Sequence, residues 1–257
     1  MLARIMTTDS MRDRVSPEEW QIRVDLAACY RLVALFGWDD VVFTHISARV
    51  PGPEHHFLIN PYGMMFEEIT ASSLVKVDLA GRIVMESEYH INPAGFTIHS
   101  AVHAAREDAL CVMHLHTDCG IAVSAQEHGL LAISQQSTFV LASLGYHDYE
   151  GLALNDEEKP RLVADLGKKT FLILRNHGLL TVGPSVADAF LSMFLLERAC
   201  RIQILAQSGG AKLIPIGAEI LAEIPAQEMV VTKGGPGRLV WPGLLRKLDR
   251  MGADYRD

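Results

Sequence analysis

The sequence predicts an α/β protein in which a mixed sheet is covered by helices. Segments rich in β-branched or apolar residues alternate with amphipathic helical segments along the chain, which is typical of an α/β fold. Several predicted strands follow one another through tight turns, and hairpins join only antiparallel strands. We therefore expect a mixed sheet rather than a purely parallel, doubly wound one.

The 257 residues divide into three parts. Residues 1–15 are polar and indicate a flexible N-terminal tail. Residues 16–210 carry the regular pattern of helices and strands and form the predicted domain. Residues 211–257 are less regular, and we expect this C-terminal extension to pack on the domain or on a neighbouring subunit, with a short helix near its end.

The domain begins with a helix that carries its own start and stop signals. Ser16 can cap the helix, Pro17 suits its first turn, and Glu19 completes a capping box. Gly37 is expected to end it. Two hairpins are predicted to follow, with strands over 41–50, 57–60, 74–79 and 83–85.

The second half of the domain alternates short buried strands with helices. Two of these helices begin at a capping residue: Thr117 caps the helix that runs to about residue 126, and Ser185 caps the longest helix. The predicted strands are 110–114, 171–174 and 179–182, and the predicted helices are 93–106, 117–126 and 184–207.

Composition excludes several classes of protein. The chain has 23 basic and 31 acidic residues and a formal net charge of −8, which argues against a nucleic-acid partner, because phosphate binding needs a basic surface. No apolar run approaches the roughly 20 residues that span a bilayer, and no signal peptide is apparent, so no membrane partner is expected. The four cysteines have no paired spacing, which favours reduced thiols and a cytoplasmic location.

Three histidines form the most informative pattern in the sequence. His114 and His116 are two residues apart at the end of a predicted strand, so their side chains point to the same face. His177 also follows a buried apolar strand. Three neutral imidazoles with an open position are typical of a catalytic zinc, iron or manganese site. A pair of hydrogen-bonded structural histidines at a strand end is the alternative for His114 and His116.

Three other histidines are candidates for acid–base roles or for the core. His99 and His103 lie one helical turn apart and share a face, but no HExxH glutamate stands between them. A half-buried structural role is expected for His103. His45 lies within a predicted strand, where it either points into a cleft or packs.

Taken together, these residues resemble the class II aldolase/adducin family, over about residues 18–210. The matching segments are THISAR at 44–49, LINPYG at 58–63, NPAGFTIHS at 92–100, HLH at 114–116 and RNHG at 175–178. Within the family, the chain is most similar to the adducin head domain and its bacterial relatives.

The resemblance implies a three-layer α/β/α sandwich with a central mixed, largely antiparallel sheet, and a homotetramer. It also implies a divalent metal, zinc in the sugar-phosphate aldolases, at positions that match His114, His116 and His177. The metal would polarise a carbonyl and stabilise an enolate.

The chain departs from the aldolase pattern where the catalytic base is expected. Gly95 stands where the aldolases have an acidic residue, and His45 stands where they have an asparagine. Removal of a general base typically lowers a rate by about 10²–10⁴-fold. We therefore assign His45 and His99 as the candidate acid and base, because imidazole titrates near neutral pH. Glu67 and Glu68 are more simply explained as a solvated charged pair.

The chain also departs from the pattern of the phosphate cradle. Pro93 and Ala94 replace two hydroxyl residues, Tyr62 replaces a threonine, and a loose alignment places Gln135 near the tyrosine acid. These changes favour a small substrate without a phosphate, and the aromatic rings of Tyr62, Phe66 and Phe96 suit such a substrate. The positions assigned to substrate binding are Tyr62, Gly63, Asn92 and Gly95.

The function predicted from these features is a divalent-metal-dependent lyase. It would carry out aldol cleavage or decarboxylation of a small carbonyl or carboxylate compound. Two alternatives stay open. One is a non-haem iron oxygenase on the same fold. The other is a non-catalytic oligomeric scaffold like the adducin head, without adducin's basic tail.

Overall fold

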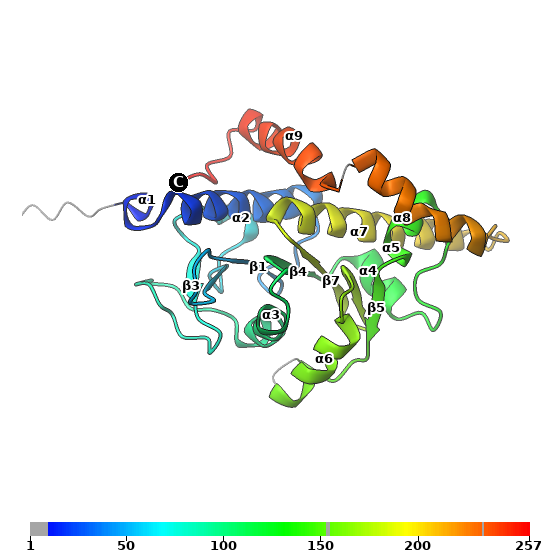
Figure 1. The fold of residues 1–257 in the computed structure, drawn as a ribbon, viewed down its shortest axis with the longest axis horizontal. Coiled ribbons are helices and arrows are strands. Elements are labelled where there is room, and N and C mark those ends of the chain that lie inside the picture. Colours follow the sequence, from blue (N-terminus) through cyan, green and yellow to red (C-terminus); the bar gives the residue numbers. More distant parts are fainter. Residues whose placement is uncertain (1–9, 153–154, 233) are drawn as a thin grey trace, which may run out of the picture.

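One seven-stranded mixed sheet forms the centre of the described part of the chain, with helices on both faces (Figure 1). In this computed structural model, the structure describes residues 10–152, 155–232 and 234–257. The strand order is β3-β2-β1-β4-β7-β6-β5, and every neighbouring pair is antiparallel except β5 and β6. The strands are β1 (His45–Arg49), β2 (Phe57–Ile59), β3 (Val75–Val77), β4 (Cys111–Leu115), β5 (Leu144–His147), β6 (Phe171–Leu174) and β7 (Gly178–Gly183).

The helices divide between the two faces of the sheet. The longest two, α2 and α7, cover one face, and α3 and α6 cover the other (Figure 1). The α-helices are α1 (Met11–Arg14), α2 (Pro17–Phe36), α3 (Pro93–Ala105), α4 (Asp118–Ser124), α5 (Gln135–Leu141), α6 (Lys159–Leu166), α7 (Val186–Ser208), α8 (Ala218–Thr232) and α9 (Pro236–Arg250). Two 3-10 turns span Phe66–Glu68 and Asp156–Glu158. The expected three-layer fold is confirmed.

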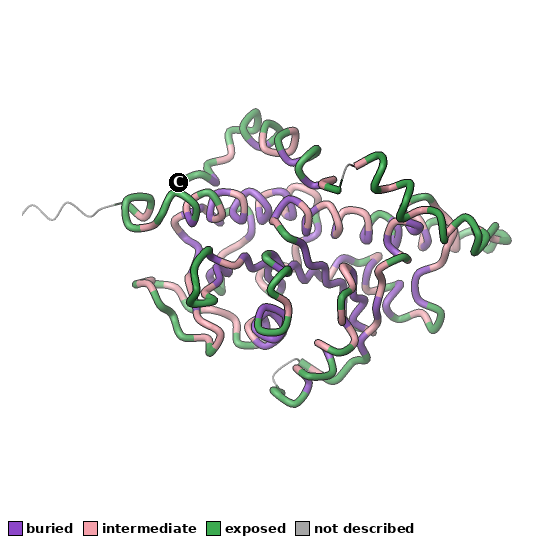
Figure 2. The backbone as a smooth tube through the Cα atoms, in the orientation of Figure 1, coloured by how far each residue is buried: buried purple, intermediate pink, exposed green. Residues whose placement is uncertain are grey.

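Alternation along the strands sends apolar side chains to both faces. Met113 and Leu115 of β4 face the core under α2 and α7. Val112 of the same strand joins a second core with α3 and α6. Figure 2 shows the buried backbone running through the sheet and the inner sides of these helices. Because His114 follows the same alternation as Val112, it lies on the side of α3 and α6.

The predicted capping residues act as expected. The Ser16 hydroxyl accepts from the Glu19 backbone N–H, and Gly37 ends α2. The Glu19 side chain does not complete the capping box; it pairs instead with Arg23 at 3.0 Å and with Lys76 at 2.8 Å. Burial of an arginine requires such a partner, so this carboxylate serves the core rather than the helix end.

Several sequence expectations need correction. Residues 83–85 do not form a strand; only an isolated bridge joins Ile83 to Val77. The extension was expected to be irregular before a short helix near its end, but it contains α8, and its last helix, α9, begins at Pro236 and has 15 residues. The short elements α5, β5 and α6 were not predicted. Of the predicted tail, residues 1–9 lie outside the described residues, and residues 11–14 form one helical turn.

The extension lies against the domain of its own chain. Helix α9 packs on α2 and α7, where the Trp241 indole donates to Asp25 at 2.8 Å and its ring lies 5.8 Å from that of Phe190. Helix α8 covers α5, yet α8 has no buried residue. Exposed apolar side chains on α8 include Ile220, Met229, Val230 and Val231.

The four cysteines are free thiols. No described helix is both long and apolar enough to cross a bilayer.

Candidate metal centre

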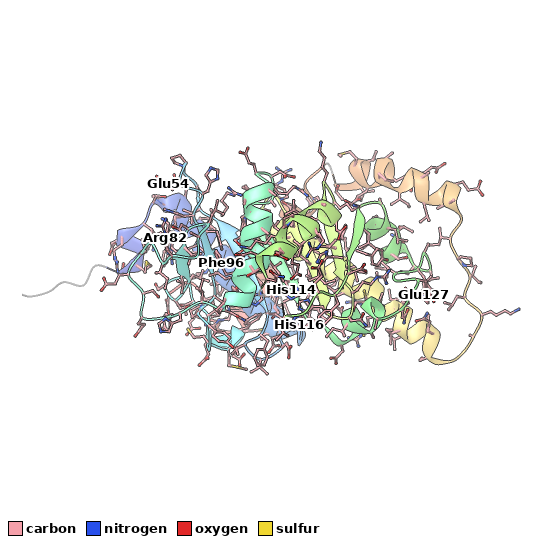
Figure 3. The ribbon with its side chains drawn as sticks, turned by 90° about the horizontal axis from the view of Figure 1, so that it is seen from below. Glu54, Arg82, Phe96, His114, His116 and Glu127 are labelled. Atoms are coloured by element: carbon pink, nitrogen blue, oxygen red, sulfur yellow. The ribbon has the colours of Figure 1, made fainter. Side chains whose placement is uncertain are left out.

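Three histidines converge where β4 and the β6–β7 turn meet. His114 is the last residue but one of β4, His116 follows the strand, and His177 lies in the turn before β7. Their ring centroids are 4.7 to 4.9 Å apart, and one nitrogen from each lies within 4.8 Å of the others. Figure 3 shows His114 and His116 side by side near the middle of the molecule. We refer to these three residues as the histidine triad.

The backbone of the β6–β7 turn explains why His177 reaches the other two. Asn176 adopts a left-handed conformation (φ 55°), which asparagine tolerates better than most residues. A Cβ on Gly178 would lie 2.5 Å from the Leu115 carbonyl oxygen and 3.1 Å from the His116 ring. Any side chain at 178 would therefore push β7 away from the triad. Arg175 holds the turn by donating to Gln126 O at 2.7 Å.

Hydrogen bonds fix the tautomers of two of the three rings. The Nδ1–H of His114 donates to Leu179 O at 3.1 Å, and the Nδ1–H of His116 donates to Asp40 Oδ2 at 2.9 Å. With these tautomers, the two Nε2 atoms both carry lone pairs, although they lie 3.0 Å apart. Two acceptors at that distance repel each other unless a proton or a cation lies between them. The donor set therefore fits a divalent ion that takes imidazole ligands.

Burial keeps the imidazoles of His114 and His177 neutral. The pKa of His114 is well below 6.5, first because of burial and then because of the neighbouring His177 and His116. Burial, followed by the charges of His116 and His147, lowers the pKa of His177 to about 4. A neutral imidazole is the form that binds a metal, so neither ligand has to lose a proton at neutral pH.

A cavity of about 500 Å³ opens onto the triad. It brings together residues from both halves of the domain, and aromatic or apolar side chains form most of its rim. Its lining residues are Asp40, Phe43, His45, Tyr62, Asn92, Ile98, His114, His116, Tyr149, Gly151, Leu152 and His177. Of the substrate-binding residues predicted from sequence, Tyr62 and Asn92 line this cavity.

His45 lies on the cavity wall next to the triad. It is opposite His114 in the β1–β4 register, and the two rings stack with centroids 5.7 Å apart. Asn92 Nδ2 donates to His45 Nε2 over 3.3 Å. Burial, then the charges of His99, His116 and His177, keep the pKa of His45 well below 6.5. His45, the residue predicted from sequence as an acid or base, therefore lines this cavity.

The other predicted residues lie outside the cavity wall. His99 is fully buried behind His45, with Ser47 Oγ 2.6 Å from its Nδ1. Gly95 lies beneath the His45 ring. Gly63 is not among the lining residues.

Of the three aromatic residues that were expected to face a substrate, one lines the cavity. Tyr62 faces the cavity, but Phe66 is buried against Tyr30 and Phe96 stacks on Phe57. Phe43 and Tyr149 line the cavity instead. Asp40 and Tyr149 come from irregular segments that no local pattern marks, and Phe43, which was predicted within a strand over 41–50, lies before β1 in an irregular segment. Glu68 accepts from the Met65 backbone N–H and is exposed, as expected for a surface pair.

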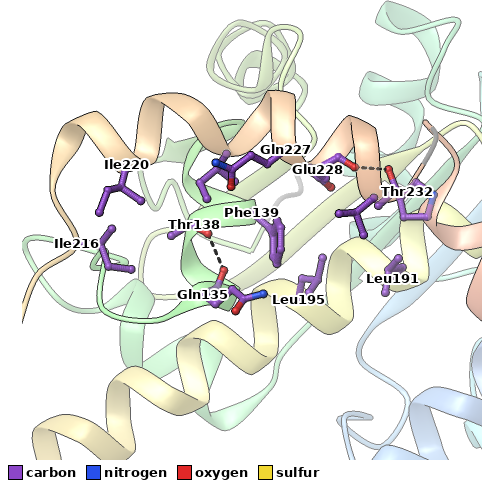
Figure 4. Close-up of a pocket in the computed structure, with 13 residues that line it drawn as sticks. Gln135, Thr138, Phe139, Leu191, Leu195, Ile216, Ile220, Gln227, Glu228 and Thr232 are labelled. Carbon is purple, nitrogen blue, oxygen red and sulfur yellow. Dashed lines mark hydrogen bonds between the residues drawn. The ribbon is translucent and has the colours of Figure 1, made fainter.

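A second cavity, of about 540 Å³, lies between α5, α7 and α8 (Figure 4). Apolar side chains such as Phe139, Leu195 and Ile220 line it, and no histidine is among its lining residues. Gln135, which the loose alignment placed at the active site, faces this second cavity. Of these two cavities, the one at the triad is the one lined by histidines.

Comparisons with known proteins agree with this architecture. Residues 24–204 match the model of the class II aldolase and adducin N-terminal domain. A Pseudomonas aeruginosa protein whose name places it in aldolase class 2 is 65% identical over 246 residues, which cover 95% of each chain. Mouse alpha-adducin is 44% identical over 90% of this chain and 33% of its own length. The L-fuculose 1-phosphate aldolase of Glaciozyma antarctica has a TM-score of 0.81 at 28% identity over 93% of both chains. The chain belongs to the class II aldolase/adducin family.

Proposed function

We propose that this protein is a divalent-metal-dependent lyase that cleaves or decarboxylates a small carbonyl or carboxylate compound without a phosphate group. The observation that carries the proposal is the histidine triad itself. Two of its imidazoles have their Nδ1–H groups engaged, and their bare Nε2 atoms face each other over 3.0 Å at the wall of a cavity. Family membership supports a metal-dependent, aldolase-like lyase in general terms.

His114, His116 and His177 would hold the ion, and zinc is the first candidate, with iron and manganese as alternatives. A bound ion of this kind supplies a Lewis acid that polarises a carbonyl oxygen. The remaining chemistry falls to the protein. His45 lies on the cavity wall, where its Nε2, which accepts from Asn92 Nδ2 in this structure, would exchange that hydrogen bond for a proton from the substrate and return the proton to the product. Asp40 orients His116.

The cavity wall supports a substrate without a phosphate. Among its described lining residues, none is lysine or arginine, and Asp40 contributes a negative charge. Phosphate sites usually use cationic side chains or helix N-termini. Tyr62, Tyr149 and Phe43 offer aromatic surface instead.

A scaffold without catalytic activity is the second candidate, because mouse alpha-adducin is 44% identical to this chain. The protein would then use its fold for assembly. The exposed apolar residues of α8 support a homo-oligomer in either case, and we propose a tetramer. Sedimentation equilibrium measures this directly.

Elemental mass spectrometry of protein purified without added metal or chelator separates the two candidates. The lyase proposal expects about one zinc, iron or manganese ion per chain. Iron would favour the oxygenase variant of the same site. If no metal is found, and none binds on titration near neutral pH, the lyase proposal fails and the scaffold is the better account.

A further inference from the structure

Gly95 and His45 share one small space beside the cavity. Gly95 lies in the first turns of α3, and His45 projects toward it from β1. A Cβ built on Gly95 would lie 2.3 Å from His45 Cδ2 and 2.5 Å from His45 Nε2. Real Cβ atoms essentially never come so close to another heavy atom, so any side chain at 95 must displace the imidazole.

The backbone gives no reason for a glycine at this position. Gly95 is not among the glycines with positive φ, and it lies within a regular helix. Alanine is the best helix former and glycine one of the worst, so helix propensity alone predicts that Gly95→Ala stabilises the protein. What Gly95 supplies is therefore space, and the group that uses the space is the His45 ring.

The His45 ring has no easy alternative position. His45 is paired with His114 of β4, and β1 also pairs with β2 from Ser47 onward, which restrains the backbone at the base of the side chain. The ring stacks on His114, approaches the His99 ring at 5.5 Å and accepts from Asn92. A Cβ on Gly95 would close the remaining side.

We propose that Gly95 is a positioning residue that acts through His45: the missing side chain at 95 makes the space in which the imidazole of His45 sits beside the histidine triad. This assignment rests on the proposed function only for the use that a reaction makes of His45. The steric pairing itself belongs to the folded chain and can be tested without a substrate.

A double-mutant cycle tests the pairing. Gly95→Ala should lower the melting temperature by about 2–10 °C, against the direction of helix propensity. In a His45→Ala background, the same change should be neutral or should raise the melting temperature, because the cavity left by the imidazole accepts the new methyl group. His45→Asn runs in parallel and keeps a polar group at 45.

Gly120→Ala is the matched control. Gly120 also lies in a helix, α4, and its Cβ would meet Leu179 and Thr117 at 2.6 Å, with no histidine among the three nearest atoms. Gly120→Ala should lower the melting temperature by the same amount in the unchanged protein and in the His45→Ala and His45→Asn backgrounds. An equal loss for Gly95→Ala in all backgrounds would overturn the pairing. So would failure of the double variant to fold when His45→Ala and His45→Asn fold.

A second readout follows the imidazole directly. Long-range ¹H–¹⁵N spectra of the histidine rings, with the His45 signals identified by their loss in His45→Asn, should show those signals displaced in Gly95→Ala and retained in Gly120→Ala. Unchanged His45 signals in Gly95→Ala would contradict the proposal. The measurement of metal content is independent of this test. If the protein binds no metal but shows the coupling between residues 95 and 45, this inference stands and the proposed function fails. If it binds metal but shows no coupling, the proposed function stands and this inference fails.

Discussion

Two groups of histidines differ in what their nitrogens meet: the triad lies where β4 and the β6–β7 turn meet, and the other group joins two residues of α3 to β1. In the histidine triad, nitrogen faces nitrogen across 3.0 Å at the wall of a cavity. The second group, which we call the buried chain, consists of His99, His103 and Ser47, and three of its four ring nitrogens meet oxygen. His103 Nδ1 donates to Ala109 O at 3.1 Å, and Ser47 Oγ lies 2.7 Å from His103 Nε2 and 2.6 Å from His99 Nδ1.

The difference shows how one residue type serves two purposes. In the buried chain, each donor has an acceptor: the Ser47 hydroxyl donates to His103 Nε2 and accepts from His99 Nδ1–H. It needs no ion to be stable, although His99 Nε2 has no partner among the described residues. In the triad, the facing lone pairs of His114 and His116 repel each other unless a proton or a cation lies between them. Oxygen partners make the buried chain structural, whereas the facing Nε2 atoms of His114 and His116 suit the triad to the metal that we propose.

Removal of two triad histidines should have the largest effect. The double variant His114→Ala/His116→Ala should lose metal binding, because one imidazole cannot hold a divalent ion against water and buffer. It should remain folded, since His116 is only partly buried and the core under α2 and α7 is untouched. Elemental analysis and circular dichroism measure both outcomes.

The buried chain supplies the control for that experiment. His103→Asn should keep the metal content of the unchanged protein while lowering its stability, because it disturbs hydrogen bonds and not ligands. An unchanged metal content in the triad variant, or its loss in His103→Asn, would reverse the roles that we assign to the two groups.

Acid should reveal the buried chain through stability. Burial, followed by the charge of His103, lowers the pKa of His99 to about 3; burial, followed by the charge of Arg49, lowers that of His103 to about 3. Both are neutral when folded, whereas the unfolded chain takes up protons as the pH falls through about 6.5. The unfolded state then binds more protons, so stability is full above pH 6.5 and is lost as the pH falls toward 3.

The slope is measurable with metal removed by a chelator. Each of these histidines contributes up to about 1.4 kcal/mol per pH unit to the fall in unfolding free energy. Urea titrations at pH 7, 6 and 5 should show a slope that is smaller by up to about this amount in His103→Asn. The same slope in both proteins would mean that His103 already binds a proton in the fold.

The sequence predicted the long, capped elements and the triad better than it predicted their surroundings. Helices α2 and α7 carry a capping serine and a clear end, so their bounds agree within a residue or two. Elements α5, β5 and α6 are short, and contacts with α7, α3 and the sheet hold them more than any local pattern does. Asp40 and Tyr149 could not be assigned to the site, because only the fold brings these irregular segments to the triad.

Spacing predicted a shared face for His99 and His103 but not their partner. Ser47 comes from β1, more than 50 residues away, and its hydroxyl decides that these rings form hydrogen bonds. The role of Gly95 was also hidden, since a glycine in a helix pattern gives no sign of the ring that needs its space. Local pattern identifies candidate residues, and tertiary contacts decide among their uses.

Loss of the Ser47 hydroxyl should destabilise the protein without touching the metal. Ser47→Ala leaves two buried ring nitrogens without a partner, which should cost about 2–4 kcal/mol of unfolding free energy. Ser124→Ala is the control, because its buried hydroxyl donates only to Ile121 O, one turn earlier in the same helix. Urea unfolding should show a much smaller change there, and metal content should stay constant in both. Equal stability losses would mean that Ser47 does not connect the histidines.

The smallest expected effect concerns the hydrogen bond between His116 Nδ1 and Asp40. At this nitrogen, a triad histidine meets an oxygen, as most ring nitrogens of the buried chain do. Asp40 accepts from His116 Nδ1–H, which directs the Nε2 lone pair toward the other ligands and makes it a better donor to a metal. Asp40→Asn keeps the shape of the side chain but offers a weaker, neutral acceptor, so metal affinity should fall by about 10–100-fold. The stability of the metal-free protein should change little, because the Asp40 side chain is 45% exposed.

Asp39→Asn is the control, because it removes the same charge one residue earlier. It should leave metal affinity within about threefold, since general electrostatics at a surface are screened by salt. Competition with a chromophoric chelator measures both variants. Equal metal affinities in the two variants would show that the Asp40 carboxylate acts only through its charge. A loss confined to Asp40→Asn would show that the triad depends on oriented hydrogen bonds, as the buried chain does. The triad would then differ from the buried chain only in leaving its Nε2 atoms for the ion.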